Sequence, residues 1–189
     1  MCNLGHLGLS NPQKCMEGWK ALLNLEYCRV TAELLEDEVM KILLATISPR
    51  RSALTGPAAT LLQDYIARSG RYSPVEHRVF ASEDGLLRFL EQAAGRTRPA
   101  LLVADSRGKQ LSSEEFARDL ERMRDSGTQS LMLGIGPADG WSAAALGRAD
   151  LTLAFGRITL PHELAAVVAA EQIYRALSIL AGHPYHSGH

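Results

Sequence analysis

The sequence has few cysteines, almost no net charge and no long uncharged apolar run. Its three cysteines, Cys2, Cys15 and Cys28, match neither a CxxC pair nor a zinc-ligand spacing, so a disulfide framework is not expected. The net charge of −1 is too small to indicate a nucleic-acid-binding protein by charge alone. The composition therefore excludes a disulfide-rich secreted domain and leaves the partner open.

A membrane or secreted location is equally unexpected. The most apolar segment, residues 164–182, contains Glu171 and Arg175, whereas a membrane span needs roughly 18 to 20 uncharged apolar residues. The N-terminus lacks the order of a secretory signal, in which basic, apolar and small residues follow one another. We therefore expect a cytoplasmic protein without membrane contact.

Residues 1–39 differ in composition from the rest of the chain. They hold all three cysteines and more acidic than basic side chains, whereas residues 40–189 are slightly basic. The segment MKILLATIS, which begins at Met40, is typical of the first strand of a domain. The sequence predicts one globular domain over residues 40–189, with residues 1–39 a poorly ordered extension or an upstream start assigned in error.

From Met40 onward, short apolar runs alternate with amphipathic segments, which is the pattern of an α/β domain with a mostly parallel sheet and helices on both faces. Ser112 and Glu115 form a capping box that predicts a helix start. The predicted strands are 41–48, 75–81, 100–105, 130–135 and 150–156, and the predicted helices are 58–70, 82–95, 112–127, 141–149 and 161–181.

Two loops after predicted strands are candidates for ligand binding. Glycines in the segment 134–140 would let the backbone approach a nucleotide or S-adenosylmethionine, although such glycines also serve simply to make tight turns. The loop 105–109 offers Arg107 and Lys109 for a phosphate, or is a solvated polar loop. Both loops follow carboxyl ends of strands, so we expect them to share one crevice. The glycines follow the fourth strand, which disfavours a Rossmann dehydrogenase.

The C-terminal histidines are poor candidates for a metal site. Pro184 interrupts any helix between His183 and His186, and the predicted domain contains no cysteine ligand. We therefore expect no metal. His162, in the first turn of the last helix, is interpreted as structural. Glu171 and Arg175 are four residues apart and are expected to bridge each other.

The segment LTLPHELAAVVAAEQIYRALSILAGHPYH, with DSRGKQLSSEEFA and IGPADG before it, resembles the ribosomal RNA large subunit methyltransferase H family of small SPOUT enzymes. The resemblance runs from Met40 to about His186. It implies S-adenosylmethionine-dependent methylation of N3 of a pseudouridine in helix 69 of 23S rRNA, within the large subunit or the assembled ribosome. It also implies a C-terminal deep trefoil knot and a homodimer whose active site takes residues from both subunits.

The resemblance also implies site residues. The donor contacts would be Ala104, Gly136, Pro137, Phe155, Gly156, Arg157, Ile158, Thr159 and Leu160. The family usually has Leu at position 104 and a second glycine at position 137, so Ala104 removes apolar surface and Pro137 removes an N–H donor.

The expected catalytic residues lie near the C-terminus. Because the imide proton of the pseudouridine must leave before its nitrogen attacks, we expect His186 to act as base or positioner. Tyr185 and Arg175 are expected to place the base or its phosphate. The alternatives are a paralogue with another RNA target, a diverged or inactive paralogue, and a non-catalytic RNA- or ribosome-binding module.

Overall fold

The computed structural model describes residues 39–49, 54–93 and 98–183. The prediction for residues 1–39 falls almost wholly outside this part of the chain, as do His186 and Tyr185. Five parallel strands form one sheet in the order β2-β1-β4-β3-β5. The strands are β1 (Lys41–Ile47), β2 (Val75–Phe80), β3 (Ala100–Gln110), β4 (Ser130–Ile135) and β5 (Leu151–Ala154). The predicted parallel α/β fold is confirmed.

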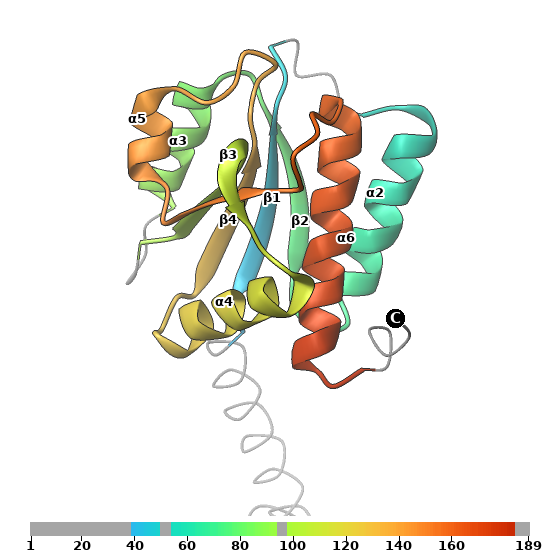
Figure 1. The fold of residues 1–189 in the computed structure, drawn as a ribbon. Helices are drawn as coiled ribbons and strands as arrows, with labels where there is room; N and C mark the ends of the chain where they lie inside the picture. The colour runs from blue at the N-terminus through green and yellow to red at the C-terminus, as the bar shows by residue number, and fades with distance from the viewer. Residues whose placement is uncertain (1–38, 50–53, 94–97, 184–189) are drawn as a thin grey trace, which may run out of the picture. The chain divides into compact units, whose positions relative to one another are not determined.

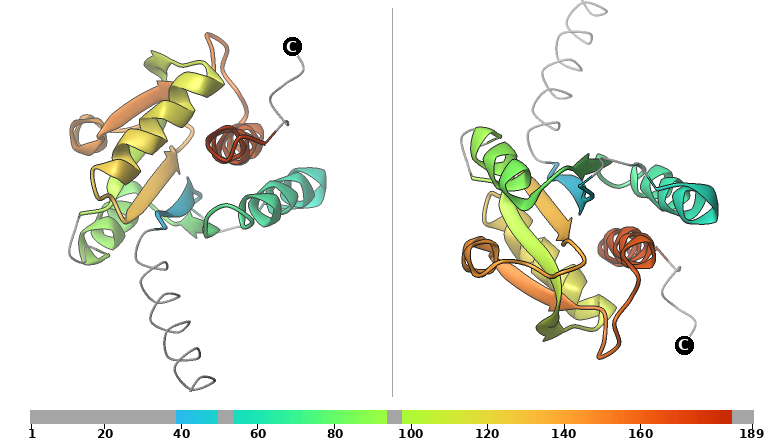
Figure 2. Two further views of the ribbon diagram at one scale, coloured as in Figure 1. Left: turned by 90° about the horizontal axis from the view of Figure 1, so that it is seen from below. Right: turned by 90° about the horizontal axis from the view of Figure 1, so that it is seen from above.

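Helices cover both faces of the sheet (Figures 1 and 2). They are α2 (Gly56–Ser69), α3 (Glu83–Gln92), α4 (Ser113–Asp125), α5 (Ala143–Arg148) and α6 (His162–Leu180). Alternate residues of the strands point to opposite faces, so Ile42 and Leu44 pack against α2, α4 and α6, whereas Ala45 and Ile47 pack on the α3 and α5 side. Each face therefore has its own apolar core.

The capping box predicted at the start of α4 is confirmed. The Ser112 side chain accepts from the backbone N–H of Glu115, and the Glu115 carboxylate accepts from the backbone N–H of Ser112 at 2.8 Å. Ser82 caps α3 by accepting from the N–H of Gly85 at 3.2 Å. These bonds satisfy N–H groups at the helix start that have no partner within the helix. The helices therefore begin where the sequence predicts them to begin.

The predicted end of the third strand is wrong. We expected it to stop at residue 105, with a loop over 105–109, but β3 continues to Gln110. Ala104 and Lys109 both pair with Leu153 of β5, so the chain bulges away at residues 105–108 and then returns to the same partner. Gly108 permits this return, because a Cβ there would lie 2.6 Å from the Leu153 carbonyl carbon.

Candidate functional site

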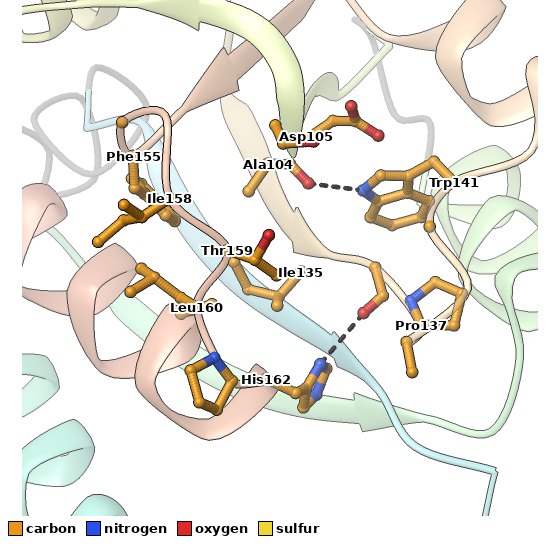
Figure 3. A pocket seen from close by; sticks show the side chains of 17 residues that line it. Ala104, Asp105, Ile135, Pro137, Trp141, Phe155, Ile158, Thr159, Leu160 and His162 are labelled. Atoms are coloured by element: carbon orange, nitrogen blue, oxygen red, sulfur yellow. Dashed lines mark hydrogen bonds between the residues drawn. The ribbon is translucent and has the colours of Figure 1, made fainter.

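A pocket of about 410 Å³ lies at the carboxyl ends of β3, β4 and β5 (Figure 3). Three chain segments surround it: the start of the β3 bulge, the loop between β4 and α5, and the loop between β5 and α6. Parallel sheets commonly bind ligands at this edge, where loops from several strands converge. The expectation that loops 105–109 and 134–140 share one crevice is confirmed, because residues of both line this pocket.

Trp141 forms one wall of the pocket. Its side chain is buried, and its ring lies so close to Gly134 and Gly136 that a Cβ on either glycine would be 2.8 Å from a ring atom. The indole Nε1 donates a hydrogen bond of 2.9 Å to the backbone oxygen of Ala104 (Figure 3). The glycines of this loop therefore make room for an aromatic ring of the protein, and the ring connects the ends of β3 and β4.

His162 connects the same loop to α6. Its Nδ1 lies 3.1 Å from the carbonyl oxygen of Gly136 (Figure 3). A carbonyl oxygen can only accept, so Nδ1 carries the proton in this bond. Nearby, Thr46 Oγ1 and His77 Nε2 are 3.0 Å apart, and burial together with the charge of His162 lowers the pKa of His77. His162 therefore fixes the entry of α6 to the floor of the pocket.

Asp105 and Arg107 form a forked ion pair within the β3 bulge. Asp105 Oδ1 accepts from Arg107 N at 2.9 Å and from Nε at 2.8 Å, and Oδ2 accepts from Nη2 at 2.9 Å. These bonds from Arg107 hold the pKa of the Asp105 carboxyl below its usual value. Asp105 lines the pocket and Arg107 does not, so the pair presents its carboxylate residue to the site.

The loop between β5 and α6 forms the opposite wall and is more exposed. Ile158 is 71% exposed although it lines the pocket. Gly156 has a φ of +120°, a backbone conformation that is strained for any residue with a side chain. Phe155 and Gly156 also line a second pocket of about 350 Å³, which extends toward α4 and the middle of α6. This loop therefore separates two cavities.

Most residues expected to contact a methyl donor come together in the first pocket. Of the nine, only Arg157 is not part of the lining; the other eight are Ala104, Gly136, Pro137, Phe155, Gly156, Ile158, Thr159 and Leu160. Three further lining residues, Asp105, Trp141 and His162, were not among the nine. Asp105 lies in a loop that the sequence offers for ligand binding, whereas nothing local in the sequence indicates that Trp141 reaches Ala104.

Arg175 is the one expected catalytic residue within the described part of the chain, and it does not line this pocket. Its guanidinium pairs with the Glu171 carboxylate at 2.6 Å, which confirms the expected bridge. It lies thirteen residues after His162 on α6, or about 20 Å along the helix at 1.5 Å per residue. His186 and Tyr185 fall outside the described residues.

Neither a metal-binding cluster nor a membrane-spanning helix is found among the described residues. Within residues 39–49, 54–93 and 98–183, no group of three or more His, Cys, Asp or Glu side chains is arranged to hold a metal ion. None of the described helices combines the length and apolar character that crossing a bilayer requires.

Comparisons with known proteins agree with the geometry. Residues 40–186 match the model of a family described as "Predicted SPOUT methyltransferase". The chain is 49% identical over 130 residues to the ribosomal RNA large subunit methyltransferase H of Koribacter versatilis, an alignment that covers 69% of this chain and 88% of that protein. The protein of the same name from Brucella ovis is 54% identical over 87 residues, which cover 46% of this chain and 52% of its own length.

Solved structures show a more distant likeness. The SpoU methyltransferase AviRb from Streptomyces viridochromogenes, solved in complex with AdoMet, is 17% identical with a TM-score of 0.43, over 78% of this chain and 60% of that chain. A probable methylase family protein from Haemophilus influenzae is 9% identical with a TM-score of 0.45, over 81% of this chain and 72% of that chain.

Proposed function

The chain belongs to the ribosomal RNA large subunit methyltransferase H family of SPOUT methyltransferases, and we propose that it methylates ribosomal RNA of the large subunit with S-adenosylmethionine as the donor. The target we propose is N3 of a pseudouridine in helix 69 of 23S rRNA, and the location is the cytoplasm. The observation that carries the proposal is the convergence of eight expected donor-contact residues on one pocket.

The pocket suits a nucleoside-sized donor. Its volume of about 410 Å³ lies within the range of small-molecule sites. Apolar side chains such as Ile135, Leu160 and Trp141 are available to cover an adenosine, while the turns at Gly136 and Gly156 bring backbone close to the ligand. Ala104 offers less apolar surface than the leucine usual in the family, and Pro137 offers no N–H, so we expect weaker donor binding than in relatives with both features.

The protein's contribution to the reaction would be alignment, exclusion of water and removal of one proton. The bound donor supplies a methyl group on a sulfonium, which is transferred by in-line displacement. The pocket walls hold that end of the reaction fixed, which converts an encounter between two substrates into a positioned step. We expect His186 to accept the proton from N3 of the target base, and Tyr185 to help place that base.

Arg175 fits this proposal if two subunits complete one site. About 20 Å of helix separates it from the pocket of its own chain. On α6, Leu164 is 51% exposed, and Val168 and Arg175 recur at helical spacing along the same side of the helix. Such a half-buried stripe is suitable for packing against a second copy. We therefore propose a homodimer in which Arg175 of one subunit approaches the donor pocket of the other.

The decisive experiment is methylation of ribosomes from a strain that lacks this protein. Purified protein and S-adenosylmethionine are incubated with separated large subunits, with assembled ribosomes and with naked 23S rRNA, and helix 69 is analysed by mass spectrometry. We expect one added methyl group on a pseudouridine. His186→Ala should lower turnover far more than donor affinity. Methylation elsewhere would indicate a paralogue with another target, and donor binding without methylation an inactive one. Ribosome binding without donor affinity would indicate a binding module.

A further inference from the structure

The donor pocket contains one formal negative charge in its wall. Among the seventeen residues that line it, Asp105 is the only carboxylate, and none is lysine or arginine. The other titratable side chain of the lining is His162, whose Nδ1 is engaged with the Gly136 carbonyl. Among the described residues of the lining, Asp105 is therefore the side chain that carries a formal negative charge.

Arg107, which pairs with Asp105, is much more exposed to solvent than the carboxylate. The Asp105 side chain is 6% exposed, whereas the Arg107 side chain is 68% exposed. Water screens an exposed charge far more than a buried one. The pair therefore has its weakly screened negative end beside the pocket and its strongly screened positive end in solvent. Of the two charges, the carboxylate is therefore the one expected to act on a ligand in the pocket.

The shape of the bulge does not by itself require a carboxylate. The bond from Arg107 N to Asp105 Oδ1 closes a turn that an asparagine oxygen can also close. The second oxygen accepts only from the arginine side chain. A neutral amide could keep this turn but would lose the charge pair with Arg107, which favours the ionised carboxylate. The charge itself is therefore the feature to explain.

We propose that the Asp105 carboxylate makes the pocket select its ligand by charge, favouring a cationic sulfonium donor over the neutral thioether product. This inference rests on the proposed function. When the methyl group leaves the sulfonium, the sulfur keeps the bonding electron pair and becomes a neutral thioether, so the net charge of the bound ligand falls by one. Arg107 pairs with this carboxylate from the solvent side, so its exposed charge offsets only part of the effect on a ligand. The same field that favours donor binding would assist product release.

Calorimetry on the full chain tests the proposal with three probes: S-adenosylmethionine, S-adenosylhomocysteine, and an analogue with an ammonium group in place of the sulfonium. In Asp105→Asn we expect the two cationic ligands to bind about three- to tenfold more weakly. The affinity for the neutral product should stay within about twofold. Thermal unfolding of each variant checks that the protein is folded.

Two further variants keep the test decisive. Asp119→Asn removes a carboxylate that also pairs with an exposed arginine, Arg122, but lies on α4 outside the pocket lining, so it should leave the affinity ratio unchanged. Arg107→Gln retains the carboxylate and should preserve or increase the preference for cations; a lost preference would count against the proposal. Equal weakening of all three ligands in Asp105→Asn, or an unchanged ratio, would overturn the inference alone. Wild-type protein that binds none of them would overturn the proposed function and this inference together.

Discussion

The two walls of the donor pocket are built differently. The wall formed by the ends of β3 and β4 is crowded: Trp141 is buried, its N–H is bonded to the Ala104 carbonyl, and two glycines lie against its ring. The wall formed by residues 155–161 is open. Ile158 is 71% exposed there, and a Cβ added to Gly156 would meet no atom within 4 Å.

This difference separates fold stability from ligand binding. In the crowded wall, added volume must displace backbone or an aromatic ring, and lost volume leaves a cavity, so substitutions there should lower the free energy of unfolding. In the open wall, the exposed Ile158 has few intramolecular contacts to lose, so its substitution should affect bound ligand more than the fold. His162 connects the two walls and should show both effects.

The largest effect is expected for Trp141→Ala in the crowded wall. Removing a buried aromatic side chain and leaving a cavity typically costs about 3 to 5 kcal/mol. Denaturant unfolding followed by far-UV circular dichroism measures the loss. Trp141→Phe keeps most of the packing but removes the N–H, so it should cost markedly less. A loss below about 1 kcal/mol for the alanine variant would show that this wall is not rigid.

Gly108→Ala should be the next most destabilising change. A new Cβ would lie 2.6 to 2.8 Å from backbone atoms of Leu153, so β3 and β5 would have to separate locally. We expect a cost of about 1 to 3 kcal/mol in unfolding free energy, together with weaker donor binding. Gly147→Ala in α5 is the matched control, because a Cβ there meets no atom within 4 Å. It should be neutral or slightly stabilising.

His162 should show an intermediate effect on both properties. His162→Ala removes the bond to the Gly136 carbonyl, which is worth about 0.5 to 1.5 kcal/mol. The donor dissociation constant should therefore rise about two- to tenfold by calorimetry, with a small loss of thermal stability. His162→Asn places a side-chain N–H close to the position of Nδ1 and should restore part of the affinity. Equal defects in both variants would argue that the hydrogen bond does not organise the pocket.

The smallest effect on stability is expected in the open wall. Ile158→Ser should change the unfolding free energy by no more than about 0.5 kcal/mol, because the side chain is mostly exposed. Donor affinity should nevertheless fall, since an apolar group that would cover the ligand is lost. Leu164→Ser is the matched control on α6, outside the pocket lining. It should retain donor affinity and weaken the proposed dimer in analytical ultracentrifugation.

Parts of the candidate site could be predicted from the sequence because a family resemblance carried positions that no local pattern indicates. The nine donor-contact residues came from that resemblance, and eight of them line the pocket. The prediction that the two loops share a crevice needed only the rule that parallel strands end at one edge. The knot and the homodimer remain predictions.

Other parts depend on contacts between segments far apart in the chain. The bulge in β3 exists because Leu153 pairs on either side of it, and the place of Trp141 depends on an oxygen thirty-seven residues earlier. The predicted loop at 105–109 failed for this reason. A polar segment that follows an apolar run is interpreted as a loop as long as the strand that pairs with it is unknown.

The sequence by itself determined the order of strands and helices along the chain, the helix starts at Ser82 and Ser112, and the two apolar faces of the sheet. These depend on side-chain alternation and on hydrogen bonds between residues three or four apart, which any chain segment can form alone. Only the tertiary structure decided that Asp105 enters the pocket wall, that Arg107 stays in solvent, and that Trp141 fills the space above the glycines. Those features require segments that are far apart in the chain to pack together. The burial of Trp141 and the difference in exposure between Asp105 and Arg107 exist only in the folded protein.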